Sequence, residues 1–537
     1  MHLRPGQMLA RTVVRRPTIL QQRAAALSRP SCSRGIFNRS KQPSVPLQPG
    51  QPSPIHQRFI RDAGYTLDFF KRFLQYSVFG FIAVSLTTLT VFEGAHQWVE
   101  SVELAPELDL DAQKWQWNLE AERWTGGEQG GTDPALGFVG RHVLRGAWMA
   151  QNWGTGSSAG VIGPNAFTGR GDSGAAGLNA TEVRLEYASE FLNAALREAE
   201  KRLPSDRLHP HSIPDIVARY ADIMERIGTK GALFEARAGF ERLWASQPER
   251  GVLAARIALK LGDLNRRLGE RDEAIAWWTR SLQLLQGKTS STDPPKVPLI
   301  PDTIPSEPLA QRTFVSLLVS LSAFYATTSQ LRQAQALEEA SLELIRSIPQ
   351  PASLDTTSPA QALHALYILH RSSLLSIHLA EVLYALRKKP VASIEWLTRA
   401  AESAERVALT LTGLPPVHPD APQSGIPHPP SSETELLPAY RKSVSMRKPA
   451  RSLLRDSRRT AAEAWNLMGV LAEASDAPES KEQALEYYER ALGWAGVAAD
   501  GPAGIGRAGE GTLESEWKIL WSNYIRAREA VLGQAKR

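Results

Sequence analysis

The stretch "LGDLNRRLGERDEAIAWWTRS" (261–281) reads as two short helices joined by a tight turn. Leu261 and Gly262 stand together in the first helix, and Ala274 follows Gly262 by twelve residues. Trp278 and Ser281 then add a large aromatic and a second small residue to the same face of the second helix. Small residues let two antiparallel helices approach closely, while large apolar residues fill the space to the next pair. The stretch therefore predicts a helical hairpin.

The same offsets recur along the chain, which identifies the pattern as the tetratricopeptide repeat. The copies comprise Tyr220, Ile223, Ala236, Phe240 and Pro248; Leu318, Leu321, Ser322, Tyr325, Ala334 and Ser341; a weaker set of Ile377, Tyr384, Ser393 and Ala400; and Trp465, Met468, Gly469, Ala484, Tyr488 and Ala491. One hairpin cannot bury its own apolar face, so the copies must stack. We predict an all-α tetratricopeptide (TPR) solenoid over residues 181–537, with proline-rich insertions at 287–308, 347–360 and 412–435.

A long apolar run precedes the repeats, in "KRFLQYSVFGFIAVSLTTLTVFEGAHQWVESVELAPE" (71–107). Residues 73–92 carry no charge, and a helix of this length is about 30 Å long, the thickness of a bilayer's hydrocarbon core. A buried helix of a soluble protein is the alternative. Lys71 and Arg72 before the run and Glu93 after it favour a single transmembrane helix, within an anchor spanning residues 62–98.

The N-terminal segment, residues 1–61, contains 11 Arg and Lys residues and no Asp or Glu. This composition is typical of a mitochondrial presequence, while a basic arm that binds nucleic acid is the alternative. Subtracting these 11 charges from the net +6 of the chain leaves −5 for the remainder, which argues against a nucleic-acid partner. Basic flanks stay on the side where insertion begins. We therefore expect a single-pass mitochondrial inner-membrane protein with its N-terminus in the matrix and its C-terminal domain in the intermembrane space.

Between the span and the repeats, residues 99–180 read as a Trp-containing helix and a Gly-rich connector. Asp109 or Asp111 is expected to cap a short helix that carries tryptophans. One further helix is expected in the apolar patch at 135–153. "GRGDSG" (169–174) matches G-x-G-x-x-G, but no strand precedes it, so a flexible loop is the better interpretation. The basic run at 440–459 is interpreted as a solvated helix face, with a binding patch as the alternative.

Catalytic chemistry has no clear signature in the sequence. The only cysteine, Cys32, lies in the presequence, and His364, His370 and His378 lack the spacing that presents two metal ligands on one helix face. We therefore predict no catalytic residue, no metal site and no cofactor. A non-enzymatic binding protein is expected, with a candidate substrate groove on the inner helix of one repeat at Arg256, Asp263 and Arg266.

These features together resemble the fungal TPR-containing adaptor subunit of the mitochondrial inner-membrane i-AAA protease complex. The run "FEGAHQWVESVELAPE" (92–107) is the most specific part, and the resemblance covers about residues 60–280 and 460–530. It implies that the chain binds misfolded or unfolded polypeptides in the intermembrane space. It also implies that the i-AAA protease and a second adaptor subunit are partners. The alternatives are a TPR scaffold for assembly or import of mitochondrial membrane complexes, and an enzyme that uses the glycine-rich loop.

Overall fold

The computed structural model describes residues 54–153, 183–205, 207–247, 251–287, 303–354, 356–414, 435–475, 479–498, 507–508 and 517–535. Pro248, the GRGDSG loop and most of the first and third proline-rich insertions lie outside these residues. The chain forms two compact units, Met1–Ser85 and Leu86–Arg537. The described part of the first unit belongs entirely to helix α1 (Pro54–Trp98), whose last turns belong to the second unit.

Two described helices are long and apolar enough to cross a membrane. The first is the helical stretch Ala63–Glu103, and none of its apolar window is buried. The second is α10 (Pro308–Thr327), whose apolar window is 67% buried. The fully buried Phe314, Leu317 and Leu318 place α10 in the core of the second unit. Only the first stretch therefore presents an uncovered apolar surface.

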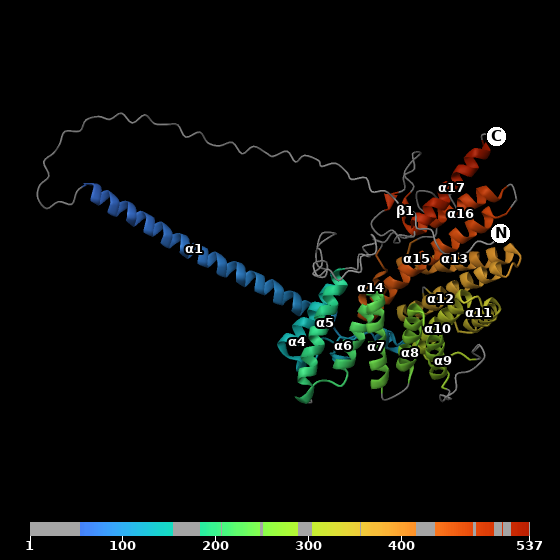
Figure 1. Cartoon of the computed structure of the whole chain (residues 1–537), viewed down its shortest axis with the longest axis horizontal. Helices are drawn as coiled ribbons and strands as arrows, with labels where there is room; N and C mark the ends of the chain where they lie inside the picture. The colour runs from blue at the N-terminus through green and yellow to red at the C-terminus, as the bar shows by residue number, and fades with distance from the viewer. Residues whose placement is uncertain are drawn as a thin grey trace, which may run out of the picture. The chain divides into compact units, whose positions relative to one another are not determined.

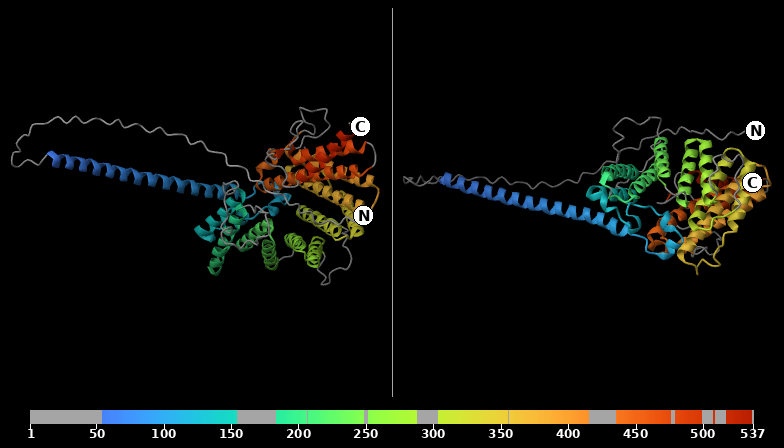
Figure 2. Two further views of the ribbon diagram at one scale, coloured as in Figure 1. Left: turned by 45° about the horizontal axis from the view of Figure 1, so that its top comes forward. Right: turned by 90° about the horizontal axis from the view of Figure 1, so that it is seen from below.

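The second unit is a stack of helices in which, from α4 onward, most helices pack on the next one along the chain and α13 packs on α15 (Figures 1 and 2). After the short helices η1 (Val99–Glu103), α2 (Leu110–Lys114), α3 (Trp117–Glu120), η2 (Gly127–Gln129) and η3 (Pro134–Leu136), the stack comprises α4 (Gly137–Asn152), α5 (Val183–Arg202) with η5 (Leu203–Ser205), α6 (Ser212–Ile227), α7 (Lys230–Ser246), α8 (Val252–Leu268), α9 (Arg271–Leu285), α10, α11 (Leu331–Arg346), α12 (Pro359–Ala385), α13 (Pro390–Thr412), α14 (Pro438–Lys442), α15 (Val444–Glu473), α16 (Ser480–Ala495) and α17 (Trp517–Ala535). Two short strands, β1 (Val497–Ala498) and β2 (Arg507–Ala508), pair antiparallel. The fold is therefore helical, as predicted.

Three hairpins close with the same turn. Gly269, Ser329 and Arg387 have φ values of 91°, 64° and 57°, so each adopts the left-handed conformation just after the first helix. In each turn the amide of the next residue donates a hydrogen bond to the carbonyl five residues earlier, at 2.9, 2.9 and 3.0 Å. These bonds satisfy carbonyls that the helix end leaves unpaired. The repetition seen in the sequence thus extends to the turn geometry.

The two helices of a hairpin approach most closely at one repeated position. A Cβ atom built on Gly262 would lie 2.4 Å from the ring of Trp278, and one on Gly469 would lie 2.5 Å from the ring of Tyr488. In the α10–α11 hairpin Ser322 takes this position, and its hydroxyl donates to Glu338 at 2.6 Å. A small residue in the first helix therefore receives a large side chain from the second.

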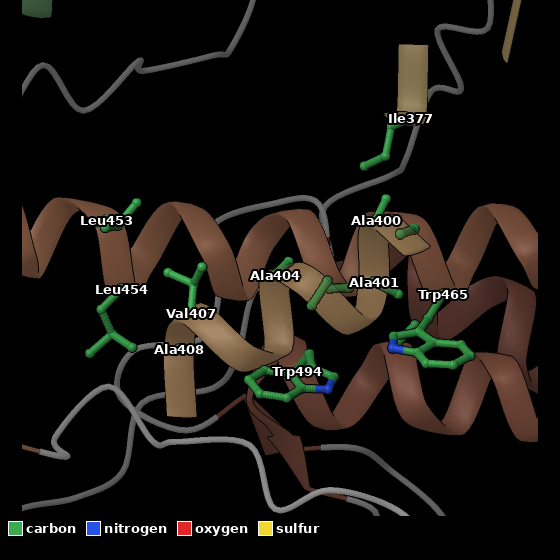
Figure 3. Close-up of a cluster of buried hydrophobic side chains, with 14 of the residues drawn as sticks. Ile377, Ala400, Ala401, Ala404, Val407, Ala408, Leu453, Leu454, Trp465 and Trp494 are labelled. Carbon is green, nitrogen blue, oxygen red and sulfur yellow. The ribbon is translucent and has the colours of Figure 1, made fainter. Parts of the chain in front are cut away.

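The C-terminal core follows the same rule (Figure 3). Ala400, Ala401 and Ala404 on α13 are fully buried in one cluster with Trp465 of α15 and Trp494 of α16. Small residues on α13 leave room for the two indoles. Both indole N–H groups donate to Glu405, at 2.6 and 2.7 Å, and Arg490 closes the network with two bonds to the same carboxylate. The buried charge of Glu405 is therefore fully partnered.

Candidate functional site: the first-helix face and the strap

The first helices of successive hairpins pack on one another along one side of the stack. Helix α8 contacts α10, α10 contacts α12, and α12 contacts α15. We call this side the first-helix face, and it includes α6 at its N-terminal end. In stacked helical repeats such a surface is an extended platform for ligands. The predicted groove residues all lie on one of these helices, α8.

The segment that follows α1 lies on the first-helix face. We call residues 103–125 the strap. Its α2 contacts α12, and its α3 contacts both α10 and α15. Asp109 caps α2 by accepting the amide of Asp111, as the sequence predicted. The helix then breaks at Gln116, whose φ of 57° starts α3 in a new direction.

Arg312 of α10 is the centre of the contact, and only 1% of its surface is exposed. Its guanidinium stacks on the ring of Trp117 at 3.8 Å from the centroid and donates to the Glu120 carboxylate at 2.7 Å. Its remaining donors reach the backbone carbonyls of Trp115 and Gln116, both at 3.1 Å. A buried arginine is tolerated when its N–H donors find acceptors in this way. The strap therefore supplies the acceptors that α10 requires.

The pKa shifts agree with this geometry. Burial alone would raise the pKa of Glu120, but the Arg312 and Arg256 guanidinium groups hold it below its usual value. His364 of α12 accepts a bond from Arg312 through Nδ1 at 3.2 Å and contacts Gln311 Oε1 through Nε2 at 3.0 Å. Burial and the Arg312 charge lower the pKa of His364 to about 3. The neutral imidazole is thus the form that fits beside the guanidinium.

Trp117 is fully buried in the core that α12, α13 and α15 form. Its indole N–H donates to the carbonyl of Ala360, at the start of α12, at 3.0 Å. Gln116 accepts the amide of Leu309, at the start of α10, at 3.0 Å. Gln116 therefore pairs an amide that the start of α10 leaves without an intrahelical partner, and Trp117 adds a bond at the start of α12.

Acidic side chains fasten the strap to the other first helices. Glu122 pairs with Arg219 of α6 at 3.2 Å and also with Lys448 of α15. The Arg447 guanidinium donates to the Glu103 carboxylate at 2.7 Å. Glu107 accepts from the hydroxyl of Ser443 at 2.6 Å and from the amide of Ser445 at 2.8 Å. With the bonds from Arg256 of α8, the strap reaches α6, α8, α10, α12 and α15. The basic run at 440–459 was predicted to form a solvated helix face. Two of its side chains, Arg447 and Lys448, instead form ion pairs with the strap.

The three predicted groove residues have three different surroundings. Arg256 donates to the Leu119 carbonyl at 3.3 Å and lies 3.7 Å from the Glu120 carboxylate, so the strap occupies it. Asp263 accepts the indole N–H of Trp278 at 3.2 Å, and burial raises its pKa. Arg266 is exposed. The structure therefore does not bring the three together as one open groove.

The predicted repeat residues pack between helices. Leu261, Ala274, Trp278, Ser281, Ala236, Ala334, Ala484, Tyr488 and Ala491 are fully buried, Phe240 and Trp465 are 5% exposed, and Gly262 and Gly469 lie against the rings described above. Tyr220 is partly buried and donates to Glu235. Their burial explains the offsets in the sequence, because each lies at a helix–helix contact.

The charged residues just after the apolar run are also engaged within the second unit. Glu93 accepts from His142 of α4 at 2.7 Å, and this bond is the main reason that its pKa falls to about 2. Glu100 accepts from Arg141 at 2.9 Å and from the Thr132 amide at 2.9 Å. His96 is buried, and burial lowers its pKa to about 4. The segment 92–107 therefore fastens α1 to the chain's own helices.

One polar cluster in the core combines a serine, a histidine and a carboxylic acid. The Ser322 hydroxyl lies 2.6 Å from Glu338 Oε1 and 2.9 Å from His378 Nδ1. Burial raises the pKa of Glu338 to about 8 and lowers that of His378 to about 4, so both groups are neutral at pH 7. In a catalytic triad the histidine lies between the serine and the acid, whereas here the serine lies between them. This geometry is that of a buried hydrogen-bond network.

Among the described residues, no group of three or more His, Cys, Asp and Glu side chains could hold a metal ion. His370, the remaining histidine of α12, contacts the Thr460 hydroxyl at 3.0 Å, away from both of the groups that hold His364 and His378.

No known family matches the sequence, and no characterised protein matches it. One solved structure, a circular tandem repeat protein with novel repeat topology and enhanced subunit contact surfaces, is 17% identical to this chain. The match covers 66% of this chain and 74% of that one, with a TM-score of 0.16.

Proposed function

We propose that the chain is a non-catalytic TPR adaptor anchored by a single span in the mitochondrial inner membrane. Its N-terminus faces the matrix, and its helical stack faces the intermembrane space. There it binds misfolded or unfolded polypeptides and delivers them to the i-AAA protease, together with a second adaptor subunit. The lipid bilayer is a further partner, and nucleic acid is not.

One observation carries this proposal: an uncovered apolar helix continues directly into a strap that contacts five helices of a repeat stack. A repeat surface fixed to a membrane span is suited to binding one partner while staying near a second partner in the same membrane. Tethering of this kind raises effective concentrations toward the mM range for short connections. Weak binding of unfolded chains would then speed their degradation without a catalytic residue.

The strap limits where such substrates bind. It covers the first-helix face at Arg256 and Arg312, so an incoming polypeptide must use other parts of the stack. The exposed Arg266, at the C-terminal end of α8, marks one such part. We propose this exposed part of α8 as the substrate surface.

The same observation favours a second candidate, a scaffold for assembly or import of mitochondrial membrane complexes. A first-helix face that is already filled has less room for extended chains, and folded partners could bind its charged borders. The two candidates differ in whether unfolded proteins accumulate when the chain is lost.

The test is the half-life of an unfolded reporter protein directed to the intermembrane space. We expect the half-life to lengthen severalfold in cells that lack this chain, and to recover when the full chain is restored. A protease that cannot hydrolyse ATP serves as the control, because the chain should then have no effect. An unchanged half-life in cells that lack the chain would exclude the adaptor role and leave the scaffold.

A further inference from the structure

A corner of apolar side chains lies beside the end of the apolar run in α1. Phe138 and Val139 belong to the first turn of α4, and 72% and 53% of their surfaces are exposed. The Phe138 ring lies 3.9 Å from the ring of His142, which lies 6.2 Å from the ring of Phe92. Phe92 is the last residue of the uncharged run and is itself 54% exposed. One imidazole therefore separates the exposed Phe138 from the end of the run.

Polar groups follow immediately behind this corner. Glu93, the next residue after Phe92, is bonded to His142 on the side of α4 that faces α1. Arg202 at the end of α5 donates to the carbonyl of Ala135, just before α4, at 3.4 Å. The corner thus passes from apolar to charged within a few residues. This order matches the boundary between hydrocarbon and headgroups in a bilayer.

Single exposed apolar residues are ordinary on soluble proteins. The position of this corner is what distinguishes it, because it continues the surface of a helix whose apolar window is entirely uncovered. Trp and Tyr gather at the depth where a membrane span leaves the hydrocarbon, and helices that lie in the interface insert Trp, Phe and Leu there. The interfacial layers add roughly 5–7 Å on each side of the hydrocarbon core, which gives room for a second element beside the span.

The geometry points to a second membrane contact, in which Phe92, Phe138 and Val139 insert together into the interfacial layer of the bilayer that α1 crosses. This inference rests on the proposed membrane anchoring. Lipid is the occupant because the corner continues the uncovered surface of α1. The chain then meets the bilayer at two places, the span and the first turn of α4.

The test measures the depth of residue 138 in the membrane. Cys32 is replaced by Ser, and one cysteine is introduced by Phe138→Cys and labelled with an environment-sensitive dye. Phe81→Cys, inside the apolar run, and Tyr384→Cys, exposed on α12, are the two references. The full chain is reconstituted in vesicles of phosphatidylcholine, phosphatidylethanolamine and cardiolipin. Some of the lipids carry a spin label either near the headgroup or deep in the acyl chain.

We expect the shallow spin label to quench the dye at position 138 at least about twofold more than the dye at position 384, as for an interfacial side chain. The deep label should quench the dye at position 81 most. If the dye at position 138 were quenched no more than the dye at position 384, while the dye at position 81 was quenched, the second membrane contact would be overturned and the anchoring would stand. Absence of quenching at 81 would overturn the membrane anchoring itself.

Discussion

At the scale of single residues, the repeat depends on a small side chain that faces a large one. Gly262 faces Trp278, Gly469 faces Tyr488, and the hydroxyl of Ser322 takes the same place in the α10–α11 hairpin. Glycine in a helix costs roughly 1 kcal/mol relative to alanine. Its presence in two first helices is explained by the ring that occupies the space of the missing Cβ atom.

Gly262→Ala should therefore destabilise the protein although alanine favours helices. The new methyl group would lie 2.4 Å from the buried Trp278 ring, and overpacking of this kind typically costs about 1–3 kcal/mol. Gly231→Ala is the matched control, because nothing lies within 4 Å of its added Cβ atom. Thermal melting of the full chain in detergent should show a lower midpoint for Gly262→Ala and an unchanged or higher one for Gly231→Ala. Equal midpoints would contradict the proposed packing.

At the scale of elements, the strap is the feature that joins the parts of the second unit. Its contacts with the first helices extend from Arg219, 97 positions after Glu122 (219 − 122), to Arg447, 344 positions after Glu103. Arg312, which is 1% exposed, and Glu120, which is 20% exposed, form the ion pair at its centre. Removing one partner of a fully buried pair typically costs about 3–5 kcal/mol, and the partial exposure of Glu120 lowers this cost.

Arg312→Met should therefore loosen the strap, because Glu120 would lose its nearest cation and Trp117 its stacked guanidinium. The rate of amide hydrogen exchange at residues 110–120 should rise at least about tenfold. A loss of about 1.4 kcal/mol in the stability of the closed strap changes its opening equilibrium by that factor. Arg346→Met is the control, since that arginine also lies over an indole, Trp396, but is exposed. If exchange of the strap were the same in both variants, the strap would not depend on the buried pair.

At the scale of the whole molecule, the local organisation was predictable from the sequence. The offset between Gly262 and Ala274, the Asp109 cap and the helix at 137–152 all arise from neighbouring residues, so periodicity and capping rules locate them. The strap could not be located in that way. Arg312 and Glu120 are 192 residues apart, and neither has a local pattern that marks it as buried. From the sequence alone, acidic residues after an apolar run indicate a solvated flank. The structure shows that Glu103 and Glu122 pair with Arg447 and Lys448 of α15.

The function that we propose requires this membrane-tethered stack to hold unfolded polypeptides for a protease. The most direct measurement places a photo-crosslinking amino acid at position 266, which is exposed on α8, and at position 384 as a control. Crosslinking is done in intact mitochondria, with the protease either active or unable to hydrolyse ATP. We predict that position 266 captures unfolded proteins of the intermembrane space, and that these products increase when the protease is inactive. Products at position 266 that consist only of folded complex subunits, and that do not change with protease activity, would contradict the claim.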